Sequence, residues 1–546
     1  MRLLDHLIVL PVLLPLVTGA LLLLVDERRH DLKAAINVAS TTALMLLAVA
    51  LMRQADQTTA SASVYLLGNW AAPFGIVLVL DRLSAMMLVL ASLLALAALI
   101  FSIARWHKAG PHFHTLFQLL LMGLNGAFLT GDLFNLFVFF EILLAASYGL
   151  VLHASTPFRI RAGMHYIVIN LAASSLFLVG VGLIYGVTGT LNMADLAMKL
   201  PAVPESERML LQAGAAILGV AFLVKAGMWP LSFWLPSAYT AAAAPVAAVF
   251  AIMSKVGIYV LLRLSLLMFG AQAGALAGFG DTWLLYGGMA TILFGAIGVL
   301  ASQAMGRLAG YYVLVSSGTL LGAIGMANVA VTSGALYYLA SSTLTIGAFF
   351  LLIELVERAQ DPAAAVLSVT MEVYGDDEDE EEEEEEEVGT AFPGTLAVLG
   401  ICFGCCGVLL AGLPPLSGFI AKFALITALF NPASALGAPT AGGTISTLAW
   451  VLSGLLILSG FAALLAMTRA GIRSFWAPLE VIVPRVQVVE IAPVLALLIL
   501  TFMLSVQGGP VMRYMDAAAQ ALHAPERYMR GVLSAAPQPA PGEARR

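Results

Sequence analysis

Most of the fold can be inferred from one apolar run, Val220-Ala-Phe-Leu-Val-Lys-Ala-Gly-Met-Trp-Pro-Leu-Ser-Phe-Trp-Leu-Pro236. With the residues before it, the run is long enough to form a membrane-crossing helix, which Pro230 and Pro236 then interrupt. Broken backbone at membrane depth is tolerated only where protein or a water-filled cavity satisfies its polar groups. Lys225 lies within two turns of this break. The run therefore predicts a discontinuous helix beside a hydrated space.

A second run, Gly412-Leu-Pro-Pro-Leu-Ser-Gly-Phe-Ile-Ala-Lys422, resembles the first. It also joins a proline break, here at Pro414 and Pro415, to a lysine in an apolar helix, Lys422. Corresponding broken helices in two parts of a hydrophobic chain are typical of transporters built from inverted repeats. Two ordinary proline kinks are the alternative interpretation.

The composition of the whole chain places it in a membrane. Of its 546 residues, 60% are hydrophobic and 11% are charged, whereas soluble domains have about 45–50% apolar and about 25% charged residues. This balance excludes a water-soluble enzyme, a disordered protein and a nucleic-acid binder. The net charge of −7 comes from one acidic run, Asp376–Glu387, without whose twelve charges it would be +5. The net charge therefore says nothing about the substrate.

The apolar runs predict about fourteen membrane helices. They cover residues 7–25, 34–52, 83–104, 113–130, 133–152, 163–187, 209–229, 244–268, 282–303, 308–328, 334–355, 395–430, 446–468 and 489–508. We expect an all-α polytopic membrane protein in which helices 7 and 12 are discontinuous. No nucleophile, metal or cofactor motif accompanies these helices, so the sequence favours a protein that is not an enzyme and has no cofactor or metal.

Basic residues predict the orientation, because loops that remain in the cytoplasm are enriched in lysine and arginine. The loops after odd-numbered helices contain most of them: Arg28, Arg29, Lys33, Arg105, Lys108, Arg159, Arg161, Arg307, Arg358, Arg469, Arg473 and Arg485. These loops, with the acidic run, should be cytoplasmic, and both termini should then face the outside.

Three lysines, Lys225, Lys255 and Lys422, lie deep in the predicted apolar helices, and Glu141 lies near the middle of the fifth. A lysine at the centre of a membrane helix costs about 2.5–3.5 kcal/mol on insertion scales. Burial lowers the pKa of a lysine and raises that of a glutamate, while pairing shifts both the other way. A lysine that moves between such environments can bind and release a proton near neutral pH, so the four residues predict a proton relay. A fixed salt bridge to Glu141 is the alternative, but it explains only one lysine.

Other polar residues are weaker candidates. Asp132 either lines a proton path or caps the fifth helix, and the cap is favoured. His165, near the end of the sixth helix, is interpreted as a packed or interfacial residue. His107, His112 and His114 make a zinc site conceivable, although anchoring at the membrane interface is the preferred interpretation.

Three motifs resemble a known superfamily, the antiporter-like subunits shared by Mrp (also Mnh or Pha) antiporters and respiratory complex I. They are the two proline-containing runs and Gly131-Asp-Leu-Phe-Asn-Leu-Phe-Val-Phe-Phe-Glu141. Within the superfamily, the chain looks most like the D-type subunits of Mrp multisubunit monovalent cation/proton antiporters. Three features favour that branch: the stretch from His165-Tyr-Ile-Val-Ile-Asn170 to Gly189-Thr-Leu-Asn-Met-Ala194, Lys422 in the twelfth helix, and the end of the chain soon after helix 14.

The resemblance implies a domain plan. Helices 1–3 would occupy residues 1–110, and two inverted five-helix repeats would follow, helices 4–8 at 111–268 and helices 9–13 at 282–468. The second repeat would contain the acidic loop 356–394, and helix 14 at 489–508 would precede a polar tail at 511–546, which we expect to be irregular.

The resemblance also implies residue roles. Glu141 and Lys225 would form the charge pair of the first half-channel, Lys255 the connecting lysine and Lys422 the terminal lysine of the second. Tyr239 stands where some members have histidine, so water could bridge Lys225 and Lys255. The expected partners are the Mrp A, B, C, E, F and G subunits in the bacterial inner membrane, with protons and Na+ or K+ as the transported ions.

Two alternatives stay open. A proton-pumping subunit of complex I or of a membrane-bound hydrogenase would use the same relay, coupled to electron transfer. A non-transporting scaffold subunit would leave the buried lysines dispensable.

Overall fold

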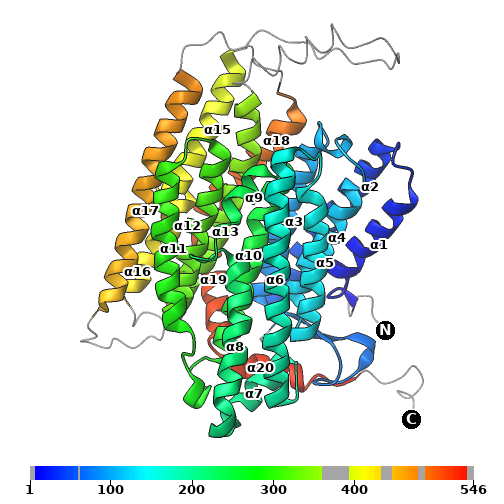
Figure 1. The fold of residues 1–546 in the computed structure, drawn as a ribbon, viewed down its shortest axis with the longest axis vertical. Helices are drawn as coiled ribbons and strands as arrows, with labels where there is room; N and C mark the ends of the chain where they lie inside the picture. The colour runs from blue at the N-terminus through cyan, green and yellow to red at the C-terminus, as the bar shows by residue number, and fades with distance from the viewer. Residues whose placement is uncertain (1–5, 59–61, 359–392, 432–444, 477–485, 538–546) are drawn as a thin grey trace.

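The computed structural model describes residues 6–58, 62–358, 393–431, 445–476 and 486–537. The expected acidic run, Asp376–Glu387, lies outside these residues. The described chain forms a helical bundle with one small hairpin (Figure 1). Its helices are α1 (Leu10–Leu24), α2 (His30–Gln57), α3 (Arg82–Ser102), α4 (Phe113–Leu129), α5 (Leu133–Val151), α6 (Pro157–Thr188), α7 (Met193–Lys199), α8 (Glu205–Ala226), α9 (Leu235–Ala241), α10 (Ala244–Met268), α11 (Asp281–Ala301), α12 (Met305–Gly325), α13 (Val329–Arg358), α15 (Pro393–Ala411), α16 (Ser417–Phe430), α17 (Thr447–Gly471), α18 (Val488–Val506), α19 (Gly508–Leu522) and α20 (Pro525–Leu533).

The predicted series of membrane helices is present, although not as fourteen full spans. By length and composition, twelve helices among the described residues can cross a membrane, and α1, α4 and α16 are shorter apolar helices. Helices α15 and α16 are the two parts of the predicted twelfth helix, separated at Gly412–Leu416. The predicted ranges are therefore all occupied by helix.

Both predicted breaks occur where the prolines stand. Helix α8 ends before Gly227 (φ +72°), and α9 begins eight residues later at Leu235. Helix α15 ends before Gly412 (φ +75°), and α16 begins at Ser417. A glycine in the left-handed conformation commonly closes a helix, because no Cβ opposes that conformation.

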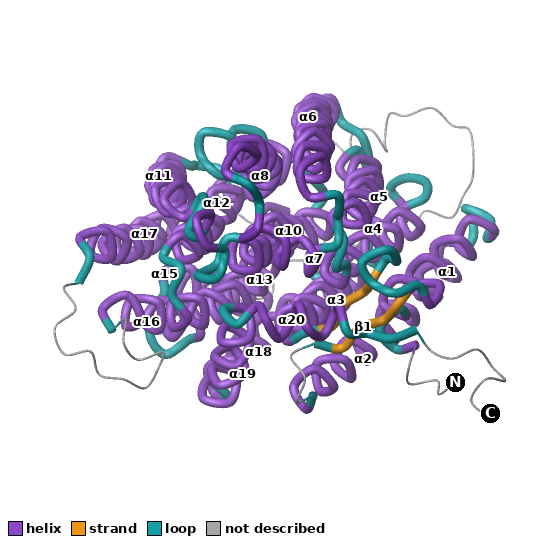
Figure 2. Tube along the Cα trace, turned by 90° about the horizontal axis from the view of Figure 1, so that it is seen from below, coloured by secondary structure: helices purple, strands orange, loops and turns teal. Residues whose placement is uncertain are grey.

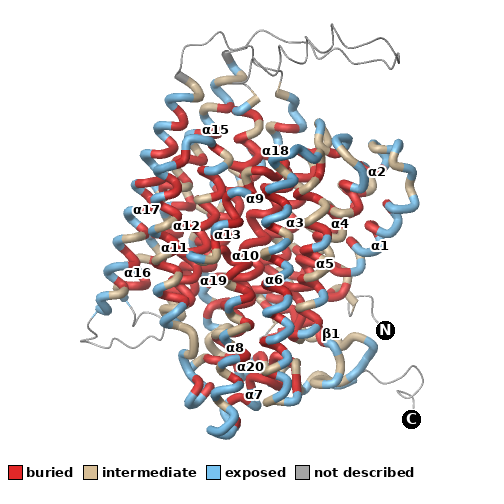
Figure 3. The backbone as a smooth tube through the Cα atoms, in the orientation of Figure 1, coloured by how far each residue is buried: buried red, intermediate tan, exposed pale blue. Residues whose placement is uncertain are grey.

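The centre of the bundle is formed by α10, α12 and α13. Their most apolar windows are 94%, 89% and 89% buried, whereas the corresponding window of α18 is 28% buried. Figure 2 shows α10 and α13 in the middle of the bundle, and Figure 3 shows burial concentrated there. A helix that is apolar around its whole circumference belongs in such a centre. Polar side chains on these three helices therefore face protein and not lipid.

Two features at the lower end of Figure 1 were not predicted. Strands β1 (Ser63–Leu66) and β2 (Val77–Leu80) pair antiparallel, with Ser63 opposite Leu80. The tail that we expected to be irregular instead forms α19 and α20, so that expectation was wrong. Alanine is the best helix former, and the buried residues Met515, Ala518 and Ala519 lie on one face of α19. Tertiary packing of this face stabilises a segment whose prolines suggested irregular structure.

Candidate functional site

The first charged residues of the predicted relay lie on α5 and α8. Lys225 in the last turn of α8 is 6% exposed, and its Nζ lies 4.8 Å from the centre of the Phe140 ring. The Glu141 carboxylate and the Lys225 ammonium group interact electrostatically. Among the described residues, however, neither Lys225 Nζ nor the buried Oε1 of Glu141 has a hydrogen-bond partner. Buried polar atoms without protein partners are usually hydrated, so water is the expected partner of these two atoms.

A third unpartnered group, Tyr148, belongs to the same place. Its hydroxyl is buried and has no hydrogen-bond partner among the described residues. It interacts electrostatically with Glu141. The neighbouring Ser147 side chain is hydrogen-bonded to the Tyr166 hydroxyl at 2.7 Å. Sequence reasoning did not single out Tyr148, although it follows Glu141 by seven residues, a spacing that places both on one helix face.

The connecting lysine, Lys255, is fully buried in the middle of α10. Its Nζ donates a 2.8 Å hydrogen bond to Ser316 Oγ on α12. Ser316 Oγ is in turn 3.0 Å from Ser342 Oγ on α13. Helices α8 and α10 pack closely here. A Cβ added at Gly257 of α10 would lie only 3.4 Å from Lys225 Cβ of α8. The two lysines thus stand on adjoining helices.

Tyr239 supports α10 directly before Lys255. Its hydroxyl donates to the Phe250 carbonyl at 2.9 Å, and its side chain is also hydrogen-bonded to Ser254. The ring packs on Phe250 with 5.4 Å between ring centres. No described contact joins Tyr239 to either lysine side chain.

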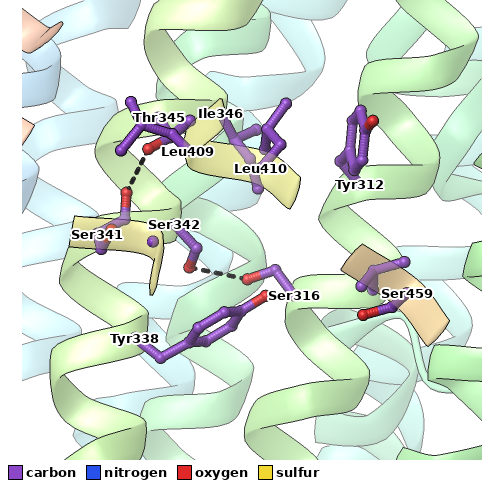
Figure 4. A pocket seen from close by; sticks show the side chains of 12 residues that line it. Tyr312, Ser316, Tyr338, Ser341, Ser342, Thr345, Ile346, Leu409, Leu410 and Ser459 are labelled. Atoms are coloured by element: carbon purple, nitrogen blue, oxygen red, sulfur yellow. Dashed lines mark hydrogen bonds between the residues drawn. The ribbon is translucent and has the colours of Figure 1, made fainter. Parts of the chain in front are cut away.

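A small cavity lies between α12, α13, α15, α16 and α17 (Figure 4). It is large enough to hold water. The polar side chains that line it are mainly hydroxyl groups: Tyr312, Ser316, Tyr338, Ser341, Ser342, Thr345 and Ser459. Ser316 and Ser342 belong to the chain of hydrogen bonds that begins at Lys255, so the cavity continues that chain toward α15 and α16.

The terminal lysine does not line this cavity but contacts Leu410, which does. Lys422 Nζ donates to the Ala411 carbonyl at 3.1 Å, and the Leu410 carbonyl is 3.5 Å away. Both carbonyls are at the broken end of α15, where no following helical turn occupies them, and Leu410 lines the cavity. Two glycines make room for the ammonium group: a Cβ at Gly412 would lie 2.6 Å from Lys422 Cδ, and one at Gly460 would lie 3.0 Å from Nζ.

The four prolines therefore serve the relay indirectly. Pro236 is buried against Gly310 of α12, whereas Pro230, Pro414 and Pro415 are exposed. The break after α15 leaves the Leu410 and Ala411 carbonyls available to Lys422. The break after α8 interrupts the helix directly after Lys225.

The weaker candidates lie apart from the relay. Asp132 caps α5, since its Oδ1 accepts a 2.9 Å hydrogen bond from the Asn135 N–H. Burial raises the pKa of Asp132, and the N–H bonds at the helix start oppose this shift. His165 is exposed on α6. His107 Nδ1 lies 3.4 Å from His114 Nε2, and burial lowers the pKa of His107. Within the described ranges, no three His, Cys, Asp or Glu side chains are placed to hold a metal ion.

Known proteins resemble this chain in sequence and in fold. A family model described as "NADH:quinone oxidoreductase/Mrp antiporter, TM" matches residues 130–446. The chain is 64% identical over 536 residues to a Rhizobium meliloti protein named as the D subunit of a probable K(+)/H(+) antiporter, covering 97% of this chain and 98% of that one. It is 32% identical over 535 residues to the D subunit of a Na(+)/H(+) antiporter of Alkalihalophilus pseudofirmus, covering 97% and 99%.

Solved structures share the fold. A chain of the Mrp complex from Dietzia sp. DQ12-45-1b matches with a TM-score of 0.82 and 26% identity, over 97% of this chain and 100% of that one. A chain of respiratory complex I from Thermus thermophilus matches with a TM-score of 0.72 and 23% identity, over 95% and 99%.

Proposed function

Because the chain belongs to the NADH:quinone oxidoreductase/Mrp antiporter family, as a D-type antiporter subunit, we propose that it carries protons for a multisubunit cation/proton antiporter. It is a transporter subunit and not an enzyme. The observation that carries the proposal is the bond from Lys255 to Ser316 and the hydroxyl-lined cavity that continues from it to the carbonyls bound by Lys422.

The proton route has two halves. The first, in residues 111–268, contains Glu141, Lys225 and the unpartnered Tyr148 hydroxyl, and the second, in residues 282–468, contains the cavity and Lys422. A proton enters at Glu141 and Lys225, passes to Lys255 and leaves Lys422 in the second half. The hydrogen-bonded hydroxyls between Lys255 and Lys422 each accept one proton while giving up another, so charge moves without displacement of the side chains.

The structure supports the need for water in the first half. Tyr239 bonds to the backbone of α10 and not to a lysine, and Glu141 and Lys225 are not joined by a direct hydrogen bond among the described residues. Water between Lys225 and Lys255 would complete the route. The buried ammonium groups of the relay repel other cations, so the cation path lies elsewhere in the complex.

We infer the partner subunits and the membrane from the family of the chain, and its orientation from its basic residues. The partners are the Mrp A, B, C, E, F and G subunits, and the location is the bacterial inner membrane. The upper end of Figure 1, where α13 ends at Arg358 and α2 begins after Arg29, faces the cytoplasm, and both termini face the periplasm. The relative at 64% identity is named for K+/H+ antiport, so K+ is the first cation to test beside Na+.

The test uses the complete complex in inverted vesicles that lack other antiporters. Glu141→Ala and Lys255→Ala should each abolish cation-dependent proton movement while all subunits still co-purify. A scaffold would tolerate both changes, and loss of a buried charge could even stabilise it. Normal exchange in both variants would disprove the relay. Proton movement that required an electron donor, and not Na+ or K+, would favour the complex I type of function instead.

A further inference from the structure

Helix α13 carries a polar stripe that extends beyond the cavity. Ser333, Tyr337, Ser341 and Thr345 recur at intervals of four residues, a spacing that places them on one face of the helix. All four are nearly or fully buried. Ser341 and Thr345 line the cavity that adjoins Lys422, whereas Ser333 lies in the first turns of α13, toward the lower end of Figure 1.

The stripe makes contacts with other elements and not only with its own helix. The Ser341 hydroxyl is hydrogen-bonded to Ser417 of α16 at 2.8 Å. The Tyr337 hydroxyl donates to the Leu504 carbonyl of α18 at 2.9 Å. The Ser333 hydroxyl donates to the carboxylate of Asp516 on α19. Three of the four side chains therefore point into the seam between α13 and the helices that follow the second break.

The stripe ends at two titratable residues of the C-terminal segment. Beside Ser333, the Thr332 hydroxyl is hydrogen-bonded to Nε2 of His523 at 2.9 Å. Asp516 and His523 are seven residues apart, so both lie on the face of α19 that meets α13. Asp516 is exposed, although its partner Ser333 is buried. A carboxylate that bonds to a buried hydroxyl and is itself exposed has the contacts that a proton outlet requires.

We propose that the proton leaves Lys422 along this stripe and that Asp516 releases it to water at the lower end of the bundle. This inference rests on the proposed relay. The Lys422 ammonium gives one proton to water in the cavity and becomes a neutral amine. Each hydroxyl of the stripe accepts a proton and passes on its own, and water bridges the turns between them. The Asp516 carboxylate gains one proton and then loses it to solvent, so the balance is one proton moved and no group changed.

The competing explanation is that Asp516 only anchors α19 to α13. Asp516→Asn separates the two roles, because the amide oxygen can still accept the bond from Ser333 but cannot take up a proton. Asp516→Glu restores a titratable group. Glu526→Gln is the matched control, since Glu526 is an exposed carboxylate of the same C-terminal segment, 2.8 Å from the Gln272 side chain and away from the stripe.

The experiment measures Na+- and K+-dependent proton movement by the complete complex in inverted vesicles, with Lys422→Ala in the same series. We expect Asp516→Asn to slow exchange by at least about tenfold, Asp516→Glu to restore most of it and Glu526→Gln to match the unaltered complex. An inactive Lys422→Ala complex beside a fully active Asp516→Asn complex would overturn the outlet and leave the relay standing. Equal loss in Asp516→Asn and Asp516→Glu would assign Asp516 a structural role. Normal exchange in Lys422→Ala would overturn both.

Discussion

The Nζ atom of Lys255 on α10 donates a 2.8 Å hydrogen bond to Ser316 Oγ on α12. Lys255 is fully buried and Ser316 is 1% exposed. This buried hydrogen bond connects the central lysine to the second half of the molecule. Ser316 also contacts Ser342 and lines the cavity. The bond therefore links a titratable group in one half to the cavity in the other.

Replacing Ser316 tests this link. In Ser316→Ala, the ammonium group of Lys255 loses its hydroxyl partner, and exchange should fall by about tenfold, the effect of removing one charged hydrogen bond of about 1.5 kcal/mol. Ser316→Thr, which keeps the hydroxyl, should retain most of the activity. Ser265→Ala on α10 is the control, because that hydroxyl only bonds to the Leu262 carbonyl of its own helix. Unchanged exchange in Ser316→Ala would exclude Ser316 from the route.

The space around Lys422 can be tested on α17. In Gly460→Ala, the new Cβ would lie 2.5 Å from the Ala411 carbonyl oxygen and 3.0 Å from Lys422 Nζ. It would push the ammonium group from its carbonyl partners, so exchange should fall strongly while assembly persists. Gly454→Ala on the same helix meets no atom within 4 Å and should be active. Vesicle assays of the pair measure the difference, and equal activity of the two variants would show that the position of Lys422 does not matter.

A buried ion pair at the lower end should stabilise the fold. Arg263 of α10 and Asp81 before α3 are 2.8 Å apart, with side chains 6% and 9% exposed. Arg263→Leu leaves the Asp81 carboxylate buried without its partner, which should cost about 3–5 kcal/mol of unfolding free energy. Arg82→Leu breaks the Arg82–Asp56 pair, in which Asp56 is 57% exposed, and should cost at most about 1 kcal/mol.

Thermal or denaturant unfolding of the purified complex measures both effects. Adding Asp81→Asn to Arg263→Leu should recover part of the loss, because asparagine can still cap α3. Equal stability of Arg263→Leu and Arg82→Leu would contradict the assignment of this pair as the stabilising one.

His523 should make stability depend on pH. Burial lowers its pKa from 6.5 to about 4, so the folded protein keeps it neutral where the unfolded chain protonates it. Between these two values the unfolded state binds more protons, and stability falls as the pH is lowered. From pH 8 to pH 5 this residue should remove about 2 kcal/mol.

Unfolding of the complex at both pH values measures this contribution. His523→Gln should reduce the loss at pH 5, whereas replacement of the exposed His165 by glutamine should leave it unchanged. An identical pH dependence in the unaltered complex and in His523→Gln would contradict the assignment.

The sequence was sufficient for the apolar membrane helices, while the roles of Glu141, Lys225, Lys255 and Lys422 stay predictions. Apolar runs of sufficient length predicted the spans, and prolines next to Lys225 and Lys422 predicted both breaks, because hydrophobicity and proline geometry act locally. The helices α19 and α20 were missed, since α19 is stabilised by packing on α13 and α3, and α20 by packing on α7, and not by their own hydropathy. Tyr148 and Ser316 were missed because uncharged hydroxyl groups are common in membrane helices, and only the fold shows which of them meet a buried charge.

The most direct test of the relay compares the complete complex with one that carries Lys422→Ala in this chain. Inverted vesicles lacking native antiporters receive Na+ or K+, and proton movement is followed while co-purification confirms that all subunits are present. If the relay carries the protons, the altered complex assembles but does not exchange protons for either cation. Exchange at the rate of the unaltered complex would contradict the relay and leave this chain a scaffold.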